Sequence, residues 1–133
     1  MTLQFSTTLR TNRIGQLQTT IGGLAILKLF SGAEPANCAA SDPSGPLITI
    51  TLPASFLTSA SGVATKAGTW AGTASAAGVA ASFRIYDGSA VCHAQGAVAQ
   101  TGTGSVEMYL DNTNIATSQS VTVSTATFTD NNS

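Results

Sequence analysis

The sequence contains little charge. Of its 133 residues, 5 are Lys or Arg and 6 are Asp or Glu, so charged side chains make up 8% of the chain, against about a quarter in a typical soluble protein. The basic residues form no run that could neutralise several phosphates, which argues against nucleic acid as a partner. With a net charge of −1, copies of the protein would repel one another only weakly. We therefore expect the surface to lie against other protein, although a secreted adhesive module could share this composition.

The sequence also lacks long apolar runs. No stretch approaches the roughly 20 residues that a membrane-spanning helix needs, and the segment Met1–Phe5 lacks the basic-then-apolar order of a secretory signal. These absences predict that the protein has no membrane partner. They also predict that it is made in the cytoplasm and is either kept there or assembled there into something larger.

Cysteine and histidine are scarce. The chain has two cysteines, Cys38 and Cys92, and a single histidine, His93, so the spacing of a zinc site is missing. Cytoplasmic synthesis favours free, buried thiols over a disulfide between the two cysteines. On a strand, Cys92 and His93 would point to opposite faces, so these two neighbours cannot form a catalytic Cys–His pair.

The acidic residues show no catalytic pattern either. The sequence offers neither the paired carboxylates of a glycoside hydrolase nor the Gly-Lys-Ser/Thr of a phosphate-binding loop. We therefore predict a protein that is not an enzyme and has no catalytic residue, cofactor or metal. Four of the six acidic residues lie in turns, where Asp forms local hydrogen bonds: Asp42, Asp87, Asp111 and Asp130.

What the sequence does contain is alternation of apolar and polar residues. In the segment 81–86, Phe83 and Ile85 alternate with Arg84 and Tyr86, which is the period of two of a half-buried β-strand. Asp87-Gly88 follows and supplies the turn of a hairpin. The sequence therefore predicts that this hairpin is central to the sheet, with Phe83 and Ile85 in the core and the polar face exposed as a contact patch.

The faces of the return strand depend on the length of the hairpin loop. A loop with an even number of residues would place Cys92 and Ala94 on the face of Phe83 and Ile85, and His93 on the face of Arg84. A loop with an odd number would exchange the two sets, because a shift of one residue turns every side chain to the other face.

Other segments also have strand character. The last of them changes parity near Ser124-Thr125, which a β-bulge would reconcile by inserting one residue. The segment Ala33–Gly45, by contrast, is rich in turn residues and long enough to be a contact or insertion loop. The remaining predicted strands are Leu24–Phe30, Pro46–Pro53, Val63–Lys66, Thr69–Ala74, Ser105–Leu110 and Ser120–Thr129.

Two of these strands share an order of residue types. Leu27–Gly32 and Phe83–Gly88 both read apolar, basic, apolar, aromatic, small polar or acidic, glycine. The basic and aromatic residues lie two positions apart, on the same face of each strand, within reach of a cation–π contact. Six positions are too few to establish an internal duplication. The shared order of residue types is explained if the two strands belong to one sheet and pack in the same way.

Residues Ser6 to Ile21 form the best helix candidate. Ser6 can cap its start and Gly22-Gly23 marks its end. Its helix propensity is low, so it needs a packing partner, which is either its own β-domain or a neighbouring subunit. Phe5 precedes the helix, whose apolar stripe consists of Leu9, Ile14, Leu17 and Ile21.

These elements define the fold class. About eight short strands with turns between them and one N-terminal helix predict a mainly β protein, an antiparallel β-sandwich. Spacing alone does not distinguish a jelly-roll-like from an immunoglobulin-like topology. We expect residues 1–23 to form a helical arm and residues 24–133 to form the β-sandwich domain.

The order of motifs resembles that of a group of small structural proteins of tailed bacteriophages that are encoded among virion genes. The resemblance extends from about Leu9 to Thr129, whereas Ala33–Asp42 and the Cys92-His93 pair depart from it. The motifs that carry it are Thr8–Arg13, Leu27–Gly32, Phe83–Gly88, Gln95–Val98, Tyr109–Ile115, Val121–Ser124 and Thr127–Thr129.

The resemblance implies a virion component, and first of all a capsid decoration (cement) protein. Such a protein would be a homo-oligomer, a dimer or trimer, that contacts the major capsid protein and copies of itself. A neck or tail component would fit the same resemblance. A carbohydrate-binding module, which would stack sugars on Trp70, Tyr86 and Tyr109, is a further alternative. The candidate protein-contact residues are Phe5, Leu9, Ile14, Leu17, Arg84 and Tyr86.

Overall fold

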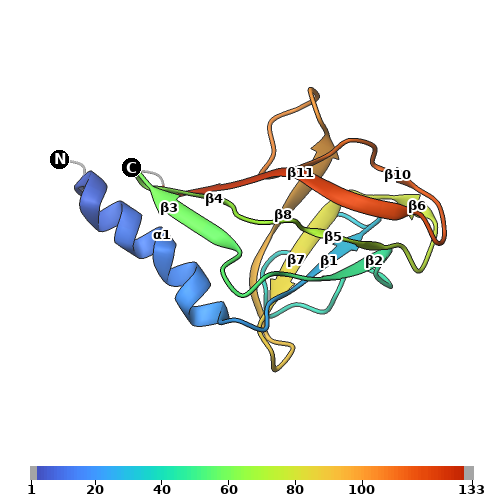
Figure 1. Ribbon diagram of the computed structural model, residues 1–133, viewed down its shortest axis with the longest axis horizontal. Coiled ribbons are helices and arrows are strands. Elements are labelled where there is room, and N and C mark those ends of the chain that lie inside the picture. Colours follow the sequence, from blue (N-terminus) through green and yellow to red (C-terminus); the bar gives the residue numbers. More distant parts are fainter. Residues whose placement is uncertain (1–2, 131–133) are drawn as a thin grey trace.

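The computed structural model describes residues 3–130, which form a mainly β fold with one helix (Figure 1). This outcome confirms the predicted fold class. The described elements are α1 (Thr7–Ile21), β1 (Ile26–Phe30), β2 (Ile48–Thr51), β3 (Leu57–Ala60), β4 (Val63–Lys66), β5 (Ala71–Thr73), β6 (Gly78–Val79), β7 (Ser82–Tyr86), β8 (Cys92–Gln100), β9 (Met108–Leu110), β10 (Asn114–Ile115) and β11 (Ser120–Thr129).

One sheet contains most of the strands. Its order is β2-β1-β7-β8-β9-β11-β4-β3, and β5 pairs with the first part of β11. The sheet curls so that the segment after β5 reaches the β1–β2 connection, where the backbone N–H groups of Ser75 and Ala76 donate to Leu47 O at 2.9 and 3.3 Å. β6 and β10 form a separate two-stranded ribbon. The curled sheet encloses the core as the two layers of a sandwich would.

One pair of described strands departs from the predicted antiparallel arrangement. β8 and β9 are parallel, with Val98 opposite Met108 and Gln100 opposite Leu110. The connection between them reverses the chain twice and includes Gly102 and Gly104 at φ +87° and +66°. Because glycine adopts these angles without steric cost, the reversal fits into a few residues. The strand predicted over Ser105–Leu110 therefore begins only at Met108.

The core is made by the inward-facing side chains of the curled sheet and by two aromatic contacts. The ring centroids of Phe56 and Trp70 lie 6.2 Å apart, and those of Phe83 and Phe128 lie 5.8 Å apart. Trp70 is fully buried, and its Nε1–H donates to Ala67 O at 3.1 Å. The largest fully buried side chains are Trp70, Phe30, Phe56, Phe83, Leu27, Leu29, Ile48, Ile50, Ile85, Met108, Leu110 and Ile115.

Several strands lie where the sequence predicted them. β4 has the predicted bounds, and the pairing of β11 with β9 shifts register between Val123 and Thr125, which confirms the predicted bulge. β3, β6 and β10 were not predicted, because they are short and rich in small or polar residues. β3 depends on a tight turn in which Ser61 and Gly62 have φ +52° and +77°, as a two-residue hairpin requires.

The helix has the predicted caps. Ser6 Oγ accepts a hydrogen bond from Leu9 N at 3.1 Å, and Gly22 N donates to Gln18 O at 2.9 Å. Figure 1 shows α1 lying along one end of the molecule beside β3 and β4. There, Gln18 Oε1 accepts from Leu57 N at 2.6 Å and Thr11 Oγ1 accepts from Gly62 N at 2.7 Å. The β-domain of the same chain is thus a partner of the helix.

The helix also connects the two ends of the described chain. The Arg13 Nε atom lies 3.1 Å from Asp130 Oδ2, and Arg10 Nη1 donates to Asp130 O at 3.2 Å. Asp130 N in turn donates to Gly62 O at 2.9 Å. The first helix turns, the β3–β4 turn and the end of β11 therefore hold one another in place.

Replacing Gly62 by alanine should test this junction. Gly62 has φ +77°, and a Cβ atom there would lie 2.8 Å from Arg10 Nη1. We expect the free energy of unfolding to fall by about 1–2 kcal/mol, because an L-residue pays for the left-handed backbone and must displace Arg10. Urea unfolding of Gly62→Ala measures the loss.

Gly45→Ala is the matched control for this substitution. Gly45 has ordinary backbone angles, and a Cβ atom there would meet no atom within 4 Å. We expect its unfolding free energy to stay within about 0.5 kcal/mol of the unsubstituted value. Equal effects of the two substitutions would contradict the proposed strain at Gly62.

Candidate functional site

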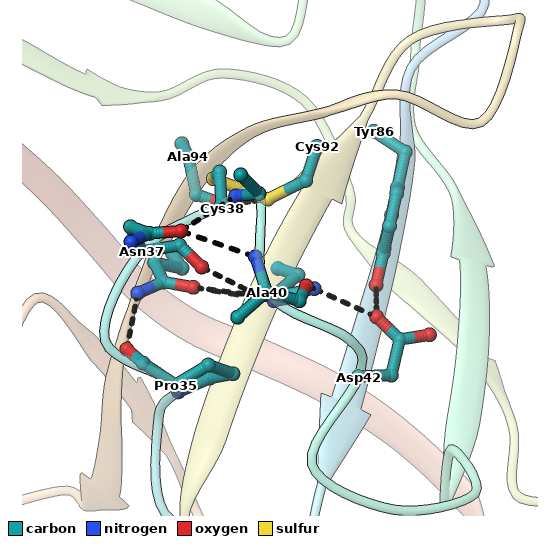
Figure 2. A network of polar contacts seen from close by, with 11 residues as sticks. Pro35, Asn37, Cys38, Ala40, Asp42, Tyr86, Cys92 and Ala94 are labelled. Carbon is teal, nitrogen blue, oxygen red and sulfur yellow. Dashed lines mark hydrogen bonds and ion pairs between the residues drawn. A yellow bond between two sulfur atoms is a disulfide. The ribbon is translucent and has the colours of Figure 1, made fainter.

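Arg84 is the centre of the most extensive polar network in the described chain. It lies in the middle of β7, opposite Lys28 of β1 and Gln95 of β8, and only 2% of its surface is exposed. An unpaired charge at such a position would be strongly destabilising, so the guanidinium must find acceptors. The loop between β1 and β2 supplies most of them, from Asn37, Ala40 and Asp42, which are labelled in Figure 2.

The five N–H donors of Arg84 all have acceptors. Nε and Nη2 donate to Gln95 Oε1 at 3.2 and 3.1 Å. Nη1 donates to Ala40 O and to Asp42 Oδ1, both at 2.9 Å, and Nη2 donates to Asn37 O, also at 2.9 Å. Three of these five bonds therefore hold the loop against the sheet, and one of them is an ion pair with Asp42.

Tyr86 belongs to the same network. Its hydroxyl donates to Asp42 Oδ1, the oxygen that also accepts from Arg84. Burial raises the pKa of Tyr86 to about 12, and the hydrogen bond to the Asp42 carboxylate acts in the same direction while Arg84 opposes it. Lys28 Nζ lies 4.9 Å from the centroid of the Tyr86 ring, a cation–π distance. This contact crosses from β1 to β7, whereas the sequence suggested pairs within each strand.

The loop between β1 and β2 is fastened at two further points. Gln95 Nε2 donates to Pro35 O at 2.6 Å. A disulfide joins Cys38 to Cys92 at the start of β8, with 5.3 Å between their Cα atoms. Asn37 Oδ1 accepts from the backbone N–H groups of Ala39 and Ala40 at 3.0 and 3.1 Å, which shapes the turn that contains Cys38. We call residues 33–45 the clamped loop.

The prediction of free thiols was wrong. The sequence did not show that the clamped loop folds back over β7 and β8 and brings Cys38 to Cys92. The expected faces of β8 were also only partly right. Ala94 lies opposite Ile85, but a bulge between Ile85 and Tyr86 inserts His93 and turns Cys92 to the face of Tyr86.

The structure also corrects the expected outer contact patch. Arg84 and Tyr86 are 2% and 6% exposed because the clamped loop covers them, so neither is an open surface residue. The four N-terminal candidates lie elsewhere. On α1, Ile14 and Leu17 pack partly against the core and Leu9 is 43% exposed, while the half-buried Phe5 ring lies 4.5 Å from Arg13 Cζ. The structure thus divides the six candidates between two separate parts of the molecule.

His93 has a structural role in the hairpin turn. Its Nε2 atom lies 2.9 Å from Asp87 Oδ2, and this hydrogen bond is the main reason why the pKa of Asp87 is lowered. Asp87 Oδ1 also accepts from the N–H groups of Ser89 and Val91 at 2.8 and 3.0 Å. The pair closes the turn between β7 and β8, while the neighbouring Cys92 sulfur is in the disulfide.

Within residues 3–130, no three His, Cys, Asp or Glu side chains are grouped so that they could hold a metal ion. No helix in this part of the chain is long and apolar enough to cross a membrane. The aromatic residues needed for sugar stacking are also poorly placed, because Trp70 is 0% and Tyr86 only 6% exposed.

An open hollow of about 330 Å³ lies beside the disulfide. Lys28 and Asp42 bring opposite charges to its lining, which also includes Arg84, Tyr86 and the two cysteines. The side chain of Asp42 is 36% exposed, so the carboxylate that binds Arg84 also meets solvent. The hollow can therefore offer a partner both a cation and an anion on a firmly held surface.

The tyrosine at this site gives a prediction about pH. The folded pKa of Tyr86 is about 12 against an ordinary value of 10.0, so the folded protein holds this proton more tightly than the unfolded chain. Stability from this group is complete below pH 10 and is lost as pH rises toward 12, by about 2–3 kcal/mol at most. The ultraviolet absorbance of tyrosinate in Tyr109→Phe, where Tyr86 is the remaining tyrosine, should rise only near pH 12.

Tyr86→Phe provides the matched comparison. Without the Tyr86 hydroxyl, the fall in unfolding free energy between pH 10 and 12 should become smaller. A Tyr109→Phe protein that titrates near pH 10 while still folded would contradict the burial and hydrogen bonding described for Tyr86.

No family model, curated protein or solved structure matches the chain. The function is therefore inferred from the fold, the clamped loop and the low charge of the chain.

Proposed function

We propose that the protein is a non-enzymatic structural protein of a bacteriophage virion, a capsid decoration (cement) protein that binds and stabilises the assembled head. The observation that carries this proposal is the clamped loop. The buried Arg84 guanidinium and the Cys38–Cys92 disulfide both serve to fix a long loop on the sheet. The polar groups of the site thus stabilise the conformation of a loop, as in a binding protein, and are not arranged to contact a substrate.

A rigid loop suits repeated binding to a protein lattice. A loop that is already ordered loses little conformational entropy when a partner covers it, so a modest contact area yields more affinity. A protein that binds only the assembled shell stabilises the shell by mass action, and many copies related by symmetry add avidity. The low charge of the chain, 8% of residues, leaves little electrostatic repulsion between neighbouring copies.

The disulfide supports a location on the outside of a particle. Disulfides persist in oxidising surroundings, which include virion surfaces, and are rare in the reducing cytosol. A virion protein made in the host cytoplasm meets an oxidising medium after the particle is released. The partners in this proposal are the major capsid protein and further copies of the chain, as a dimer or trimer.

The number of copies per particle tests the proposal. Quantitative mass spectrometry of purified virions of the phage that encodes the chain should find hundreds of copies. A dozen copies or fewer would instead support a neck or tail component, and no copies would overturn a virion role. Glycan binding by the isolated folded protein would favour the carbohydrate-binding alternative, which the burial of Trp70 and Tyr86 makes the weaker one.

The face that meets the shell can be tested separately. Ser41 is exposed on the clamped loop, so Ser41→Arg should weaken binding to shells that lack the protein by at least about tenfold, since a bulky cation would enter the contact. Thr58→Arg, at an exposed position on β3, is the matched control and should bind normally. Cosedimentation with empty shells measures both, and equal binding by the two variants would place the contact elsewhere.

A further inference from the structure

The non-covalent contacts of the clamped loop surround Cys38 closely. Arg84 holds the carbonyl of Asn37, the residue before Cys38, and the carbonyl of Ala40, two residues after it. Asn37 Oδ1 binds the N–H groups of Ala39 and Ala40. None of these bonds involves a sulfur atom. The position of Cys38 is therefore fixed on both sides by contacts that do not need the disulfide.

The position of Cys92 is fixed in the same way. Cys92 begins β8 and lies opposite Tyr86, directly after the turn that Asp87 and His93 close. Gln95, three residues further along β8, binds both Arg84 and Pro35 O. β8 thus contains both Cys92 and Gln95, and Gln95 anchors the loop that contains Cys38. Sheet and loop together bring the two cysteines to a Cα–Cα distance of 5.3 Å, within the usual range for a disulfide.

Arg84 would resist opening of the loop even without the disulfide. The loop supplies three of the four acceptor atoms of Arg84, and only Gln95 Oε1 would remain if the loop moved away. A guanidinium that is 2% exposed cannot exchange those acceptors for water without a large rearrangement. The reduced protein should therefore keep the loop closed, with the two thiols next to each other.

We propose that Arg84 is a positioning residue for the oxidation of Cys38 and Cys92: the loop closes on Arg84 first, and the disulfide then locks a loop that is already in place. The oxidant is a small-molecule disulfide such as oxidised glutathione. One protein thiolate attacks a sulfur of the oxidant and releases one thiol, which leaves a mixed disulfide. The second protein thiolate then attacks this mixed disulfide and releases the second thiol. The protein loses two electrons and two protons, and the oxidant gains them. This inference does not depend on the proposed function.

The inference predicts that the reduced protein is preorganised. Hydrogen exchange of the wild-type chain, reduced with a dithiol under native conditions, should show protected N–H groups at Ala39 and Ala40, whose acceptor is Asn37 Oδ1. Exchange at the rate of an unstructured peptide, while the strands stay protected, would overturn the proposal. This measurement needs no variant.

The second test measures the effective concentration of one thiol with respect to the other. This quantity is obtained by equilibrating the protein with mixtures of reduced and oxidised glutathione. Arg84→Gln should lower it at least about tenfold. Gln95→Ala removes the hydrogen bond to Pro35 O but keeps the three Arg84 contacts with the loop. It should therefore lower the effective concentration less than Arg84→Gln does. Arg13→Gln, at the distant ion pair with Asp130, should leave it unchanged. A folded Arg84→Gln or Gln95→Ala protein with the wild-type value would overturn the role of the anchors.

Discussion

Replacing Arg84 by methionine is expected to lower the free energy of unfolding by about 3–5 kcal/mol. Methionine fills much of the space of the arginine stem but donates no hydrogen bond. The substitution leaves the carbonyls of Asn37 and Ala40 and the Gln95 side-chain oxygen without the Arg84 donors. It also removes the cation that pairs with Asp42, whose carboxylate keeps only the hydrogen bond from Tyr86. The loss is large because these acceptors remain partly buried, and an unpaired buried polar group costs about 1–3 kcal/mol.

Arg13→Met is the matched control for this prediction. Arg13 also pairs with a carboxylate, at 3.1 Å, but its side chain is 45% exposed. Asp130 is 11% exposed, but solvent reaches the pair through Arg13, so its loss should cost about 1 kcal/mol. The two substitutions should therefore differ by several-fold in urea unfolding under identical conditions. A loss at Arg84 as small as the loss at Arg13 would show that the clamped loop contributes little to stability.

Replacing both cysteines by alanine should lower the free energy of unfolding by about 3–4 kcal/mol. Cys38 and Cys92 are 54 residues apart in the sequence, and a cross-link of this span restricts the unfolded chain by about that amount in the chain-entropy account. Because the loop keeps its contacts with Arg84, the double variant should still fold to the same structure. Denaturant unfolding without reductant, together with circular dichroism, measures both expectations.

The wild-type protein is its own control in this experiment. With a reductant present, its unfolding free energy should fall to within about 0.5 kcal/mol of the double variant, since both then lack the cross-link. Each single substitution should behave like the double one. A double variant as stable as the oxidised wild-type chain would contradict a stabilising role for the disulfide.

The sequence predicted those parts of the fold that depend on local pattern. Alternation located β7 and β11, and the change of parity near Ser124 located the bulge in β11. β4 was predicted with its observed bounds in a stretch of small residues where Val63 is one of few large apolar residues. β3 was missed because Thr58-Ser59-Ala60 carries no apolar signal, and its hairpin depends on the backbone angles of Ser61 and Gly62. The parallel pairing of β9 was missed because flexible glycines, and not a hydrophobic pattern, reverse the chain before it.

The site was missed for a different reason. Alternation in β7 correctly divided polar from apolar faces, but it did not show that the polar face is covered. All five residues of β7 are buried, because the clamped loop lies on the side of Arg84 and Tyr86. The loop residues that bind Arg84 precede it by 42 to 47 positions in the sequence. The available signals were an arginine in the middle of a strand and two cysteines, and neither shows where a loop will fold.

The cross-link also makes part of the chain a closed covalent ring. It joins residues 38 and 92, so the ring contains β2 through β7 in full. A protease that cuts one peptide bond anywhere between these two cysteines would produce a nicked protein that is still one molecule. Its two pieces would separate only after reduction. The exposed turn Gly88–Ala90 lies within the ring and can therefore be cleaved once without loss of either half of the sheet.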